Sequence, residues 1–482
     1  MMLSELVPEK IIPVYVRIRG ISDDSRSVEP GDLFCALLNG RSFVAEAVSR
    51  GAVAVACDPP ALNASVPVIV VKDLRDRLGD FASRANGHPS HKVEVIAVTG
   101  TNGKTSFTHF LGQALTAVGL RTGLIGTMGF GLPDCLREPG LTTPAAVDLQ
   151  AKIKRLVDDK CRTIVLEASS HGLDQARLSG LAVDIAVLTN LTTDHLDYHA
   201  TIENYRAAKR LLFEKTTLSN AVLNLDDEFG RELASGLESR MNIVTFSQMD
   251  PAATVYCRSV VFDITGLRLQ IMVGADEMDI ELPVFGEFNV ENVLSVIGAM
   301  VAMGYSITDI SRALGTLKPV FGRMDIVDRY GRPRIIVDYA HNPDSLRKAL
   351  HSVRLHFPNK KLHVVFGCGG ERDKGKRALM GQIAEDLADK VILTSDNPRS
   401  ENPEDILADI ELGMKTRGVV MADRREAIIH AISSALEEDV VLIAGKGHED
   451  YQLLPEGRVP FSDYEVIGDG LENWSLENGK GY

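Results

Sequence analysis

Residues 99–105, with the sequence TGTNGKT, combine the residue types that bind phosphate. This segment overlaps the end of the apolar run 93–99 and leads into a helical pattern, the order of elements in which a phosphate-binding loop occurs. Glycines let backbone N–H groups approach phosphate oxygens, and the start of a helix adds positive potential. Lys104 can reach the β- and γ-phosphates, and Thr105 can bind Mg²⁺. The alternative is a glycine-rich turn with a surface lysine. Val98 stands where the general loop pattern has glycine, which indicates a subclass of these loops.

Other side chains could act together with such a loop in metal binding or catalysis. Glu167 ends the apolar run TIVLE, where a carboxylate could reach a metal ion, although a strand-end glutamate can also be simply solvated. His195 and His199 are four residues apart and could form half of a zinc site, but no HExxH motif or cysteine ligands accompany them. Lys209 lies in an AAK segment, where spacing alone predicts an exposed helical lysine.

Alternating apolar runs and polar loops predict the elements that hold these residues. Residues 1–88 contain short apolar runs separated by turn residues, which predicts a small N-terminal α/β domain. The non-periodic segment 85–92 is expected to be a linker. Residues 89–321 then predict a central P-loop domain with a parallel sheet. Its expected elements are strands at 93–99, 163–167 and 184–190 and helices at 105–118 and 290–303.

Residues 322–482 repeat the strand and helix scheme and predict a C-terminal Rossmann-like domain. The expected strands are 334–338, 362–366, 390–394 and 440–444. Each strand runs directly into a polar loop, and ligands of open α/β sheets collect at the carboxyl ends of strands. The four loops therefore predict a binding site, and the fold class is α/β with three domains.

Composition limits the possible functions further. The 482 residues carry a net charge of −14 without a Lys/Arg-rich block, which argues against a protein that binds nucleic acid or anionic membranes. A content of 45% hydrophobic and 24% charged residues excludes a disordered or fibrous protein. The six cysteines include no CxxC pair, and no signal peptide or membrane span is evident, so we expect a cytoplasmic protein with reduced thiols.

The phosphate-binding segment resembles the loop of the Mur ligases and folylpolyglutamate synthetases, which are ATP-dependent amide-forming enzymes. GTPases fit poorly, because residues 190–194 (NLTTD) lack the lysine of their base-reading loop. Further motifs are similar to the MurE type of Mur ligase in its meso-diaminopimelate-adding form, and the resemblance spans essentially the whole chain. These motifs are 194–199 (DHLDYH), 367–377 (GCGGERDKGKR), 396–399 (DNPR) and 445–449 (GKGHE).

The resemblance implies that meso-diaminopimelate is added to UDP-MurNAc-L-Ala-D-Glu through an acyl phosphate, in peptidoglycan precursor synthesis. It implies ATP and Mg²⁺ as cofactors, a CO₂-carboxylated Lys209 and a monomeric protein. Implied catalytic residues are Lys104, Glu167, His195 and Lys209, and implied metal ligands are Thr105, Glu167, His195 and Lys209.

The resemblance also implies three groups of binding residues. Those for ATP are Gly100, Thr101, Asn102, Gly103, Lys104, Thr105, Ser106, Asn292, Arg323 and Asp338, with Asn289 and His341 nearby. Those for the UDP-MurNAc-dipeptide are Ser25, Thr142, Thr143, Ser169, Gln175 and Arg177, where serine and threonine could equally be helix caps. Those for diaminopimelate are Arg372, Asp396, Asn397, Pro398, Arg399, Gly445 and Glu449.

Arg399 is expected to select the amino acid. Diaminopimelate differs from lysine by a second carboxylate on the distal carbon, which a guanidinium can bind through two parallel hydrogen bonds. The alternative is that Arg399 caps its loop and pairs with Glu401.

Two other functions compete with this interpretation. Folate polyglutamylation uses a similar loop but leaves the DNPR motif and the N-terminal DSR and PGDLF segments unexplained. A nucleotide-sensing regulator without catalysis is disfavoured by the joint presence of Lys104, Glu167, His195 and Lys209.

Overall fold

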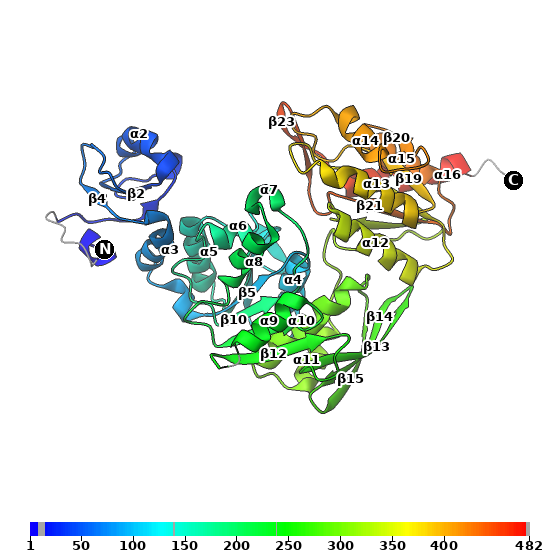
Figure 1. The fold of residues 1–482 in the computed structure, drawn as a ribbon, viewed down its shortest axis with the longest axis horizontal. Coiled ribbons are helices and arrows are strands. Elements are labelled where there is room, and N and C mark those ends of the chain that lie inside the picture. The colour runs from blue at the N-terminus through cyan, green and yellow to red at the C-terminus, as the bar shows by residue number, and fades with distance from the viewer. Residues whose placement is uncertain (8–14, 138–139, 238, 479–482) are drawn as a thin grey trace.

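The computed structural model describes residues 1–7, 15–137, 140–237 and 239–478. Three main sheets follow one another along the described chain (Figure 1). The N-terminal part, blue in Figure 1, and the yellow-to-red C-terminal part lie on opposite sides of the central part. None of the described helices is long and apolar enough to cross a membrane.

The N-terminal part contains a four-stranded parallel sheet in the order β1-β2-β3-β4. Successive residues of β2 point to opposite faces, so that Leu33 and Cys35 enter one apolar cluster and Phe34 and Ala36 enter another. Both faces of the sheet are therefore covered. Its elements are α1 (Leu3–Leu6), β1 (Ile21–Ser22), η1 (Ser25–Ser27), β2 (Leu33–Ala36), η2 (Leu38–Phe43), α2 (Val44–Ser49), β3 (Ala54–Cys57), β4 (Val68–Val70), α3 (Leu74–Ala85) and η3 (Pro89–Lys92).

The central part contains an eleven-stranded sheet in the order β15-β14-β13-β12-β11-β10-β5-β9-β6-β7-β8. Strands from β13 to β6 in this order are parallel, whereas β14, β15, β7 and β8 extend the two ends as antiparallel strands. The strands are β5 (Glu94–Thr99), β6 (Thr122–Gly126), β7 (Gly129–Leu132), β8 (Cys135–Arg137), β9 (Thr163–Glu167), β10 (Ile185–Leu188), β11 (Asn220–Asn224), β12 (Asn242–Ser247), β13 (Val255–Asp263), β14 (Gly266–Val273) and β15 (Asp276–Leu282).

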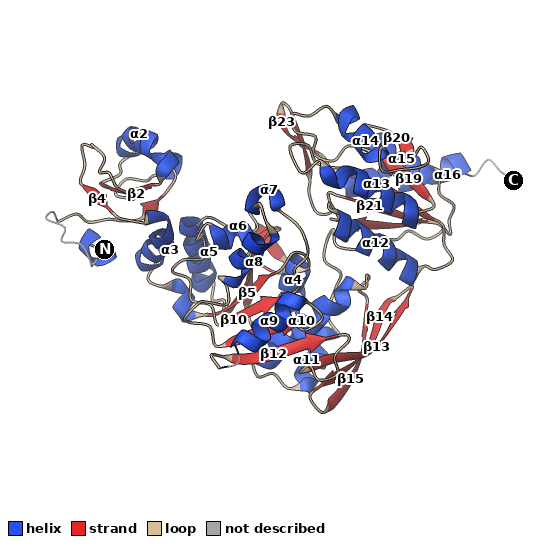
Figure 2. Ribbon diagram, viewed as in Figure 1, coloured by secondary structure: helices blue, strands red, loops and turns tan. Residues whose placement is uncertain are grey.

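Helices cover both faces of this central sheet (Figure 2). In β5, Ile96 and Val98 face the cluster that contains residues of α4, α10 and α11, whereas Val95 and Ala97 face the cluster of α5 and α9. Burial on both faces explains why the parallel strands are continuous apolar runs. The helices are α4 (Lys104–Ala117), α5 (Ala146–Asp158), α6 (Ser170–Asp174), α7 (Leu196–His199), α8 (Ile202–Arg210), α9 (Glu228–Leu237), α10 (Phe288–Ala302) and α11 (Ile307–Leu314).

The C-terminal part contains a six-stranded sheet in the order β16-β17-β21-β18-β19-β20, in which β16 is antiparallel and the other strands are parallel. A hairpin of β22 and β23 follows β21 along the chain. The elements are β16 (Asp325–Val327), β17 (Arg334–Asp338), α12 (Pro343–His356), β18 (Leu362–Phe366), α13 (Gly375–Leu387), β19 (Lys390–Leu393), α14 (Pro403–Glu411), β20 (Val419–Val420), α15 (Arg424–Ser433), β21 (Val440–Ala444), β22 (Tyr451–Leu454), β23 (Gly457–Pro460) and α16 (Asp463–Asn478).

The α/β fold class predicted from the sequence is confirmed. Predicted strands 163–167, 334–338, 362–366 and 440–444 match β9, β17, β18 and β21 residue for residue. The sequence did not reveal the antiparallel extensions of the central sheet or the β22–β23 hairpin.

A buried ion pair joins α15 to α16 in the C-terminal part. The Nε and Nη2 atoms of Arg424 donate to the two carboxylate oxygens of Asp463, each at 2.7 Å, and both side chains are fully buried. The guanidinium also donates to the carbonyl of Ala444 at the end of β21. The ion pair therefore fixes both helices against the strand ends that precede the polar loops.

We expect Asp463→Ala to lower the free energy of unfolding of the C-terminal part by about 3–5 kcal/mol, because it leaves a buried guanidinium without its counter-charge. Urea unfolding can be followed through the fluorescence of Trp474, the single tryptophan of the chain, whose Nε1 donates to the carbonyl of Ala435. The double variant Arg424→Met/Asp463→Leu removes both charges and should lose much less stability. If Asp463→Ala were as stable as the wild type, the stabilising role of this ion pair would be contradicted.

Candidate active site

The phosphate-binding loop connects the end of β5 to the start of α4. Gly103 is the residue before α4 and has φ of +87°, a conformation that L-residues with a side chain rarely adopt. A Cβ atom at this position would lie 2.3 Å from Oδ1 of Asn292, so only glycine fits. The loop therefore brings backbone N–H groups and a helix N-terminus to one point, an arrangement that binds anions.

Lys104 and Lys209 converge on the carbonyl oxygen of Gly100. Their Nζ atoms donate to this oxygen at 2.8 and 2.7 Å, and Lys104 also donates to the carbonyl of Thr101. Lys209 is only 1% exposed, so the alternative of an exposed helical lysine is wrong. Burial, reinforced by the positive charge of Lys104, holds the pKa of Lys209 well below its usual range. Lys209 is therefore a buried amine that is easily deprotonated.

Glu167 is also buried, at 1% exposure, and the alternative of a solvated carboxylate is wrong. Its Oε2 atom accepts hydrogen bonds from the hydroxyls of Thr105 at 3.1 Å and Thr127 at 3.0 Å, and its Oε1 accepts the backbone N–H of Thr127. Carboxylate and hydroxyl oxygens are the hard donors that Mg²⁺ prefers, so Thr105 and Glu167 fit this ion. Thr127 follows β6 and was not identified from the sequence.

His195 lies at the start of α7 in a left-handed conformation with φ of +52°. Its ring centroid is 4.9 Å from that of His171 in an edge-to-face arrangement. Partial burial, aided by the charge of Lys104, lowers the pKa of His195 to about 4, which favours the neutral imidazole. No hydrogen bond joins His195 to Glu167 within the described chain. Among the described residues, no three His, Cys, Asp or Glu side chains gather as a possible metal cluster.

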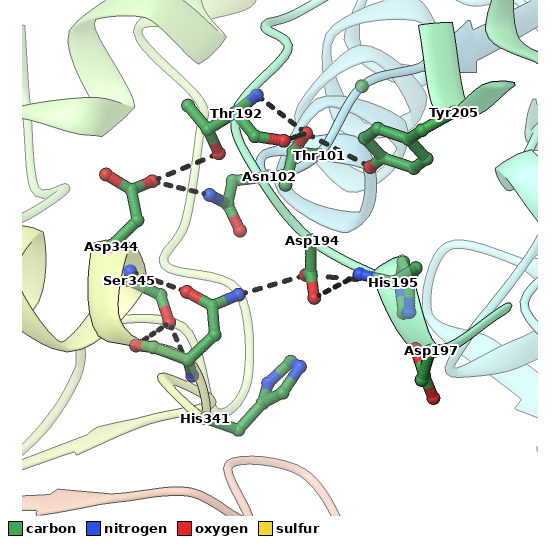
Figure 3. Close-up of polar contacts among 12 residues, drawn as sticks. Thr101, Asn102, Thr192, Asp194, His195, Asp197, Tyr205, His341, Asp344 and Ser345 are labelled. Carbon is green, nitrogen blue, oxygen red and sulfur yellow. Dashed lines mark hydrogen bonds and ion pairs between the residues drawn. The ribbon is translucent and has the colours of Figure 1, made fainter. Parts of the chain in front are cut away.

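Polar contacts connect the C-terminal part directly to the phosphate-binding loop (Figure 3). The amide of Asn102 donates to the carboxylate of Asp344 in α12 at 3.0 Å. Similarly, Asn342 before α12 donates to Asp194 at 3.1 Å. On the other side of the loop, the hydroxyl of Thr101 is 3.1 Å from that of Tyr205. The start of α12 thus rests on the loop and on the segment after β10.

A small cavity of about 70 Å³ is lined by several of the predicted nucleotide residues. Arg323 lines this cavity, and its guanidinium carbon lies 4.3 Å from the ring centroid of Tyr339. The same guanidinium donates a hydrogen bond to the hydroxyl of Thr105 at 3.3 Å. Burial raises the pKa of Asp338 to about 6. Asn289 supports Asn292 by accepting its amide hydrogen but does not line the cavity. Predicted residues that line it are Asn102, Gly103, Ser106, Asn292, Arg323, Asp338 and His341.

A larger cleft of about 740 Å³ lies between the central and C-terminal parts. The four polar loops that follow β17, β18, β19 and β21 line one side of it, and residues 193–197 with Thr142 line the other. Six of the seven residues predicted for diaminopimelate contribute to this lining: Arg372, Asp396, Asn397, Arg399, Gly445 and Glu449. Pro398 lies in the same loop but is not part of the lining.

The Arg399 guanidinium donates only to carbonyl oxygens in the described chain, those of Gly370 at 2.7 Å and Asn397 at 3.3 Å. Glu401 instead pairs with Arg377 and Lys374, so the expected alternative of an Arg399–Glu401 pair is wrong. The cleft therefore contains a guanidinium without a carboxylate partner among the described residues.

Four of the six residues predicted for the dipeptide form one hydrogen-bonded network. Arg177 donates to the Thr143 carbonyl and to the side chain of Gln175, and the Thr143 hydroxyl is 3.0 Å from that of Ser169. Ser169 also caps α6, as its alternative role predicted. Thr142 is 3.0 Å from the hydroxyl of Thr127. Ser25 lies in the N-terminal part, where it donates to Glu46.

Comparison with known proteins agrees with this architecture. Residues 98–300 match the Mur ligase middle domain, and residues 322–447 match the Mur ligase, glutamate ligase domain. The chain is 45% identical over 471 residues to the UDP-N-acetylmuramoyl-L-alanyl-D-glutamate--2,6-diaminopimelate ligase of Pseudomonas syringae pv. tomato, and the match covers 96% of each chain. It is 44% identical to the protein of the same name from Xylella fastidiosa, which covers 97% of this chain and 96% of the relative.

A solved structure of a ligase with the same name has a TM-score of 0.72 at 36% identity and covers 98% of this chain and 99% of its own. Folylpolyglutamate synthase of Mycobacterium tuberculosis covers 81% of this chain and 93% of its own with a TM-score of 0.63, but at 18% identity this likeness shows the fold alone. The family resemblance inferred from the motifs is confirmed, and the chain belongs to the Mur ligase family.

Proposed function

We propose that this protein is an ATP-dependent ligase that joins meso-diaminopimelate to UDP-MurNAc-L-Ala-D-Glu in peptidoglycan precursor synthesis. The main supporting observation is the Arg399 guanidinium, which has no carboxylate partner among the described residues and lies in a cleft that also contains the carboxylates of Asp396 and Glu449. The relatives that are 42–45% identical and named for this activity support the same substrates.

The proposed reaction has two steps. An oxygen of the terminal D-Glu carboxylate attacks the γ-phosphorus of ATP, which forms an acyl phosphate and releases ADP. The amine of diaminopimelate then attacks the acyl carbon, the C–O bond to phosphate breaks, and the amine loses a proton as the amide forms. Both steps require anions to be held in line while their repulsion is neutralised.

Residues around the phosphate-binding loop would supply this neutralisation. Lys104 and the N-terminus of α4 face the position expected for the β- and γ-phosphates. Thr105 and Glu167 would hold Mg²⁺, with His195 and a carboxylated Lys209 as the further proposed ligands. When bound, Mg²⁺ would neutralise phosphate charge. Asn292, Arg323 and Asp338 would hold the nucleoside part of ATP beside the loop.

Carboxylation of Lys209 needs a deprotonated amine, because only its free electron pair can attack CO₂. The buried position of Lys209 and its lowered pKa supply this condition. The N–C bond that forms, together with loss of a proton, converts a potential cation into an anionic oxygen ligand. The change would also relieve the repulsion between Lys209 and Lys104.

The other assignments follow from the same proposal. Thr142, Thr143, Ser169, Gln175 and Arg177 would bind the dipeptide end of the acceptor, and Ser25 its uridine side. We further propose a cytoplasmic monomer that binds no nucleic acid and does not insert into membranes, with domains of residues 1–88, 89–321 and 322–482.

Phosphate release from ATP tests the proposed function directly. We expect release only when UDP-MurNAc-L-Ala-D-Glu and meso-diaminopimelate are both present, with one tripeptide product formed per phosphate. A folate polyglutamylating enzyme would instead respond to folate and glutamate. A nucleotide-binding regulator would give no substrate-dependent release, and either result would overturn the proposal.

Lys209→Ala should abolish this activity, and short-chain carboxylic acids should restore part of it by supplying oxygen ligands in the vacated space. Lys215→Ala is the matched control, because Lys215 is a partly buried lysine of the same part that donates to the carbonyls of Leu178 and Leu181. Its activity should not respond to added acids. Full activity of Lys209→Ala without any acid would reject the carboxylated lysine.

Arg399→Ala should lower kcat/KM for diaminopimelate at least ~10-fold, because loss of a charge-assisted hydrogen-bonded pair costs about 1.5–3 kcal/mol. The poorer reaction with L-lysine, which lacks the distal carboxylate, should fall less. Arg417→Ala, at an exposed arginine of the same part, serves as the control. Equal losses with both amino acids, or a wild-type preference for lysine, would show that Arg399 is not the selector.

A further inference from the structure

Lys446 is a fully buried lysine directly behind the wall of the large cleft. It follows Gly445 in the loop after β21 and has 0% exposure, and it is not part of the cleft lining. Its Nζ atom lies 3.0 Å from Oε2 of Glu449 and 3.2 Å from Oδ1 of Asn397. Both of these partners line the cleft, so Lys446 contacts the proposed amino-acid site from the protein side.

The two carboxylate oxygens of Glu449 have different hydrogen-bond partners. Oε2 accepts from Lys446 and from the amide nitrogen of Asn397 at 2.9 Å. Oε1 has only a long contact of 3.5 Å from the hydroxyl of Tyr339 within the described chain. Because Oε2 is held by two donors, the carboxylate is fixed in one orientation and Oε1 remains able to accept a hydrogen bond from a ligand.

Lys446 also determines how the Asn397 amide is oriented. A lysine ammonium has only donors, so it must face the amide oxygen rather than the amide nitrogen. Oδ1 of Asn397 additionally accepts the backbone N–H of Leu453 at 2.9 Å, which ties the hairpin of β22 and β23 to the same loop. The amide nitrogen is then directed to Glu449.

A buried ammonium beside a mostly buried carboxylate has a further electrostatic effect. Removal of the ammonium alone leaves the Glu449 carboxylate without its compensating charge, which is strongly unfavourable for a carboxylate that is only 14% exposed. The carboxylate would then turn toward water in the cleft or bind a proton. Either change removes the fixed acceptor that a substrate ammonium would meet.

We propose that Lys446 is a positioning residue that holds Glu449 and Asn397 in the orientation that binds the ammonium end of the incoming amino acid. This inference rests on the proposed function, because it assigns the residue a role in diaminopimelate binding. Lys446 does not touch the substrate and acts through its two partners. Replacing Lys446 should therefore weaken the binding of diaminopimelate but not that of ATP or of the UDP-MurNAc-dipeptide.

Steady-state kinetics of Lys446→Met test this role. The KM for diaminopimelate should rise at least ~10-fold, because an orienting charge-assisted hydrogen bond is lost, whereas the KM values for ATP and for the UDP-MurNAc-dipeptide should change less than ~3-fold. Lys446→Gln keeps N–H donors without the charge, so its KM for diaminopimelate should lie between those of Lys446→Met and the wild type. Lys415→Met makes the same exchange at an exposed lysine of the same part and should leave all three KM values unchanged.

A double-mutant cycle with Glu449→Gln separates positioning from a purely structural role. If Lys446 acts through Glu449, adding Lys446→Met to Glu449→Gln should raise the KM for diaminopimelate by no more than ~2-fold. Removing both charges should also recover melting temperature relative to Lys446→Met alone. Additive effects on KM, or an unfolded double variant, would show that the lysine serves only the fold and would overturn the proposal.

Failure of this inference can be distinguished from failure of the proposed function. A wild-type protein without diaminopimelate-dependent phosphate release would overturn the function itself. A wild-type protein that uses diaminopimelate, together with an unchanged KM in Lys446→Met, would overturn only the role of Lys446.

Discussion

Two lysine side chains end at a single carbonyl oxygen, that of Gly100, and this crowding of positive charge is the constraint on which the site depends. Lys209 is fully buried and Lys104 is partly buried, and loss of hydration lowers the pKa of both amines. The Glu167 carboxylate opposes this shift for Lys104, whereas the charge of Lys104 reinforces it for Lys209. The two amines are therefore unequal, with Lys104 suited to remain a cation and Lys209 suited to react as a free base.

The parallel sheets explain why residues far apart in the sequence reach this point. Ends of β5 and β9 supply the phosphate-binding loop and Glu167, and the segment after β10 supplies His195. Loops after β17, β18, β19 and β21 supply the facing wall of the cleft. In both sheets the loops that supply the site follow the carboxyl ends of the strands. The two sets of loops meet where Asp344 contacts Asn102 and Asn342 contacts Asp194.

Much of this arrangement could be predicted from local sequence, because buried parallel strands are continuous apolar runs and their carboxyl ends share one edge. The burial of Lys209 could not be predicted from local sequence, because it depends on how α8 packs beside the phosphate-binding loop. The AAK segment itself contains no sign that its lysine is buried. Thr127 belongs to a turn after β6 whose sequence has no catalytic pattern, yet it donates twice to Glu167. Lys446 belongs to the GKGHE motif, but only its 0% exposure shows that its side chain lies behind the cleft wall.

If the crowded cations bring phosphate and carboxylate together, a carboxylate oxygen must pass to phosphorus during the reaction. The most direct measurement uses UDP-MurNAc-L-Ala-D-Glu labelled with oxygen-18 in the terminal carboxylate, with mass spectrometry of the released phosphate. One labelled oxygen in each phosphate, and the other in the new amide, is the expected result. Phosphate free of label would contradict an acyl phosphate and the site described around Gly100.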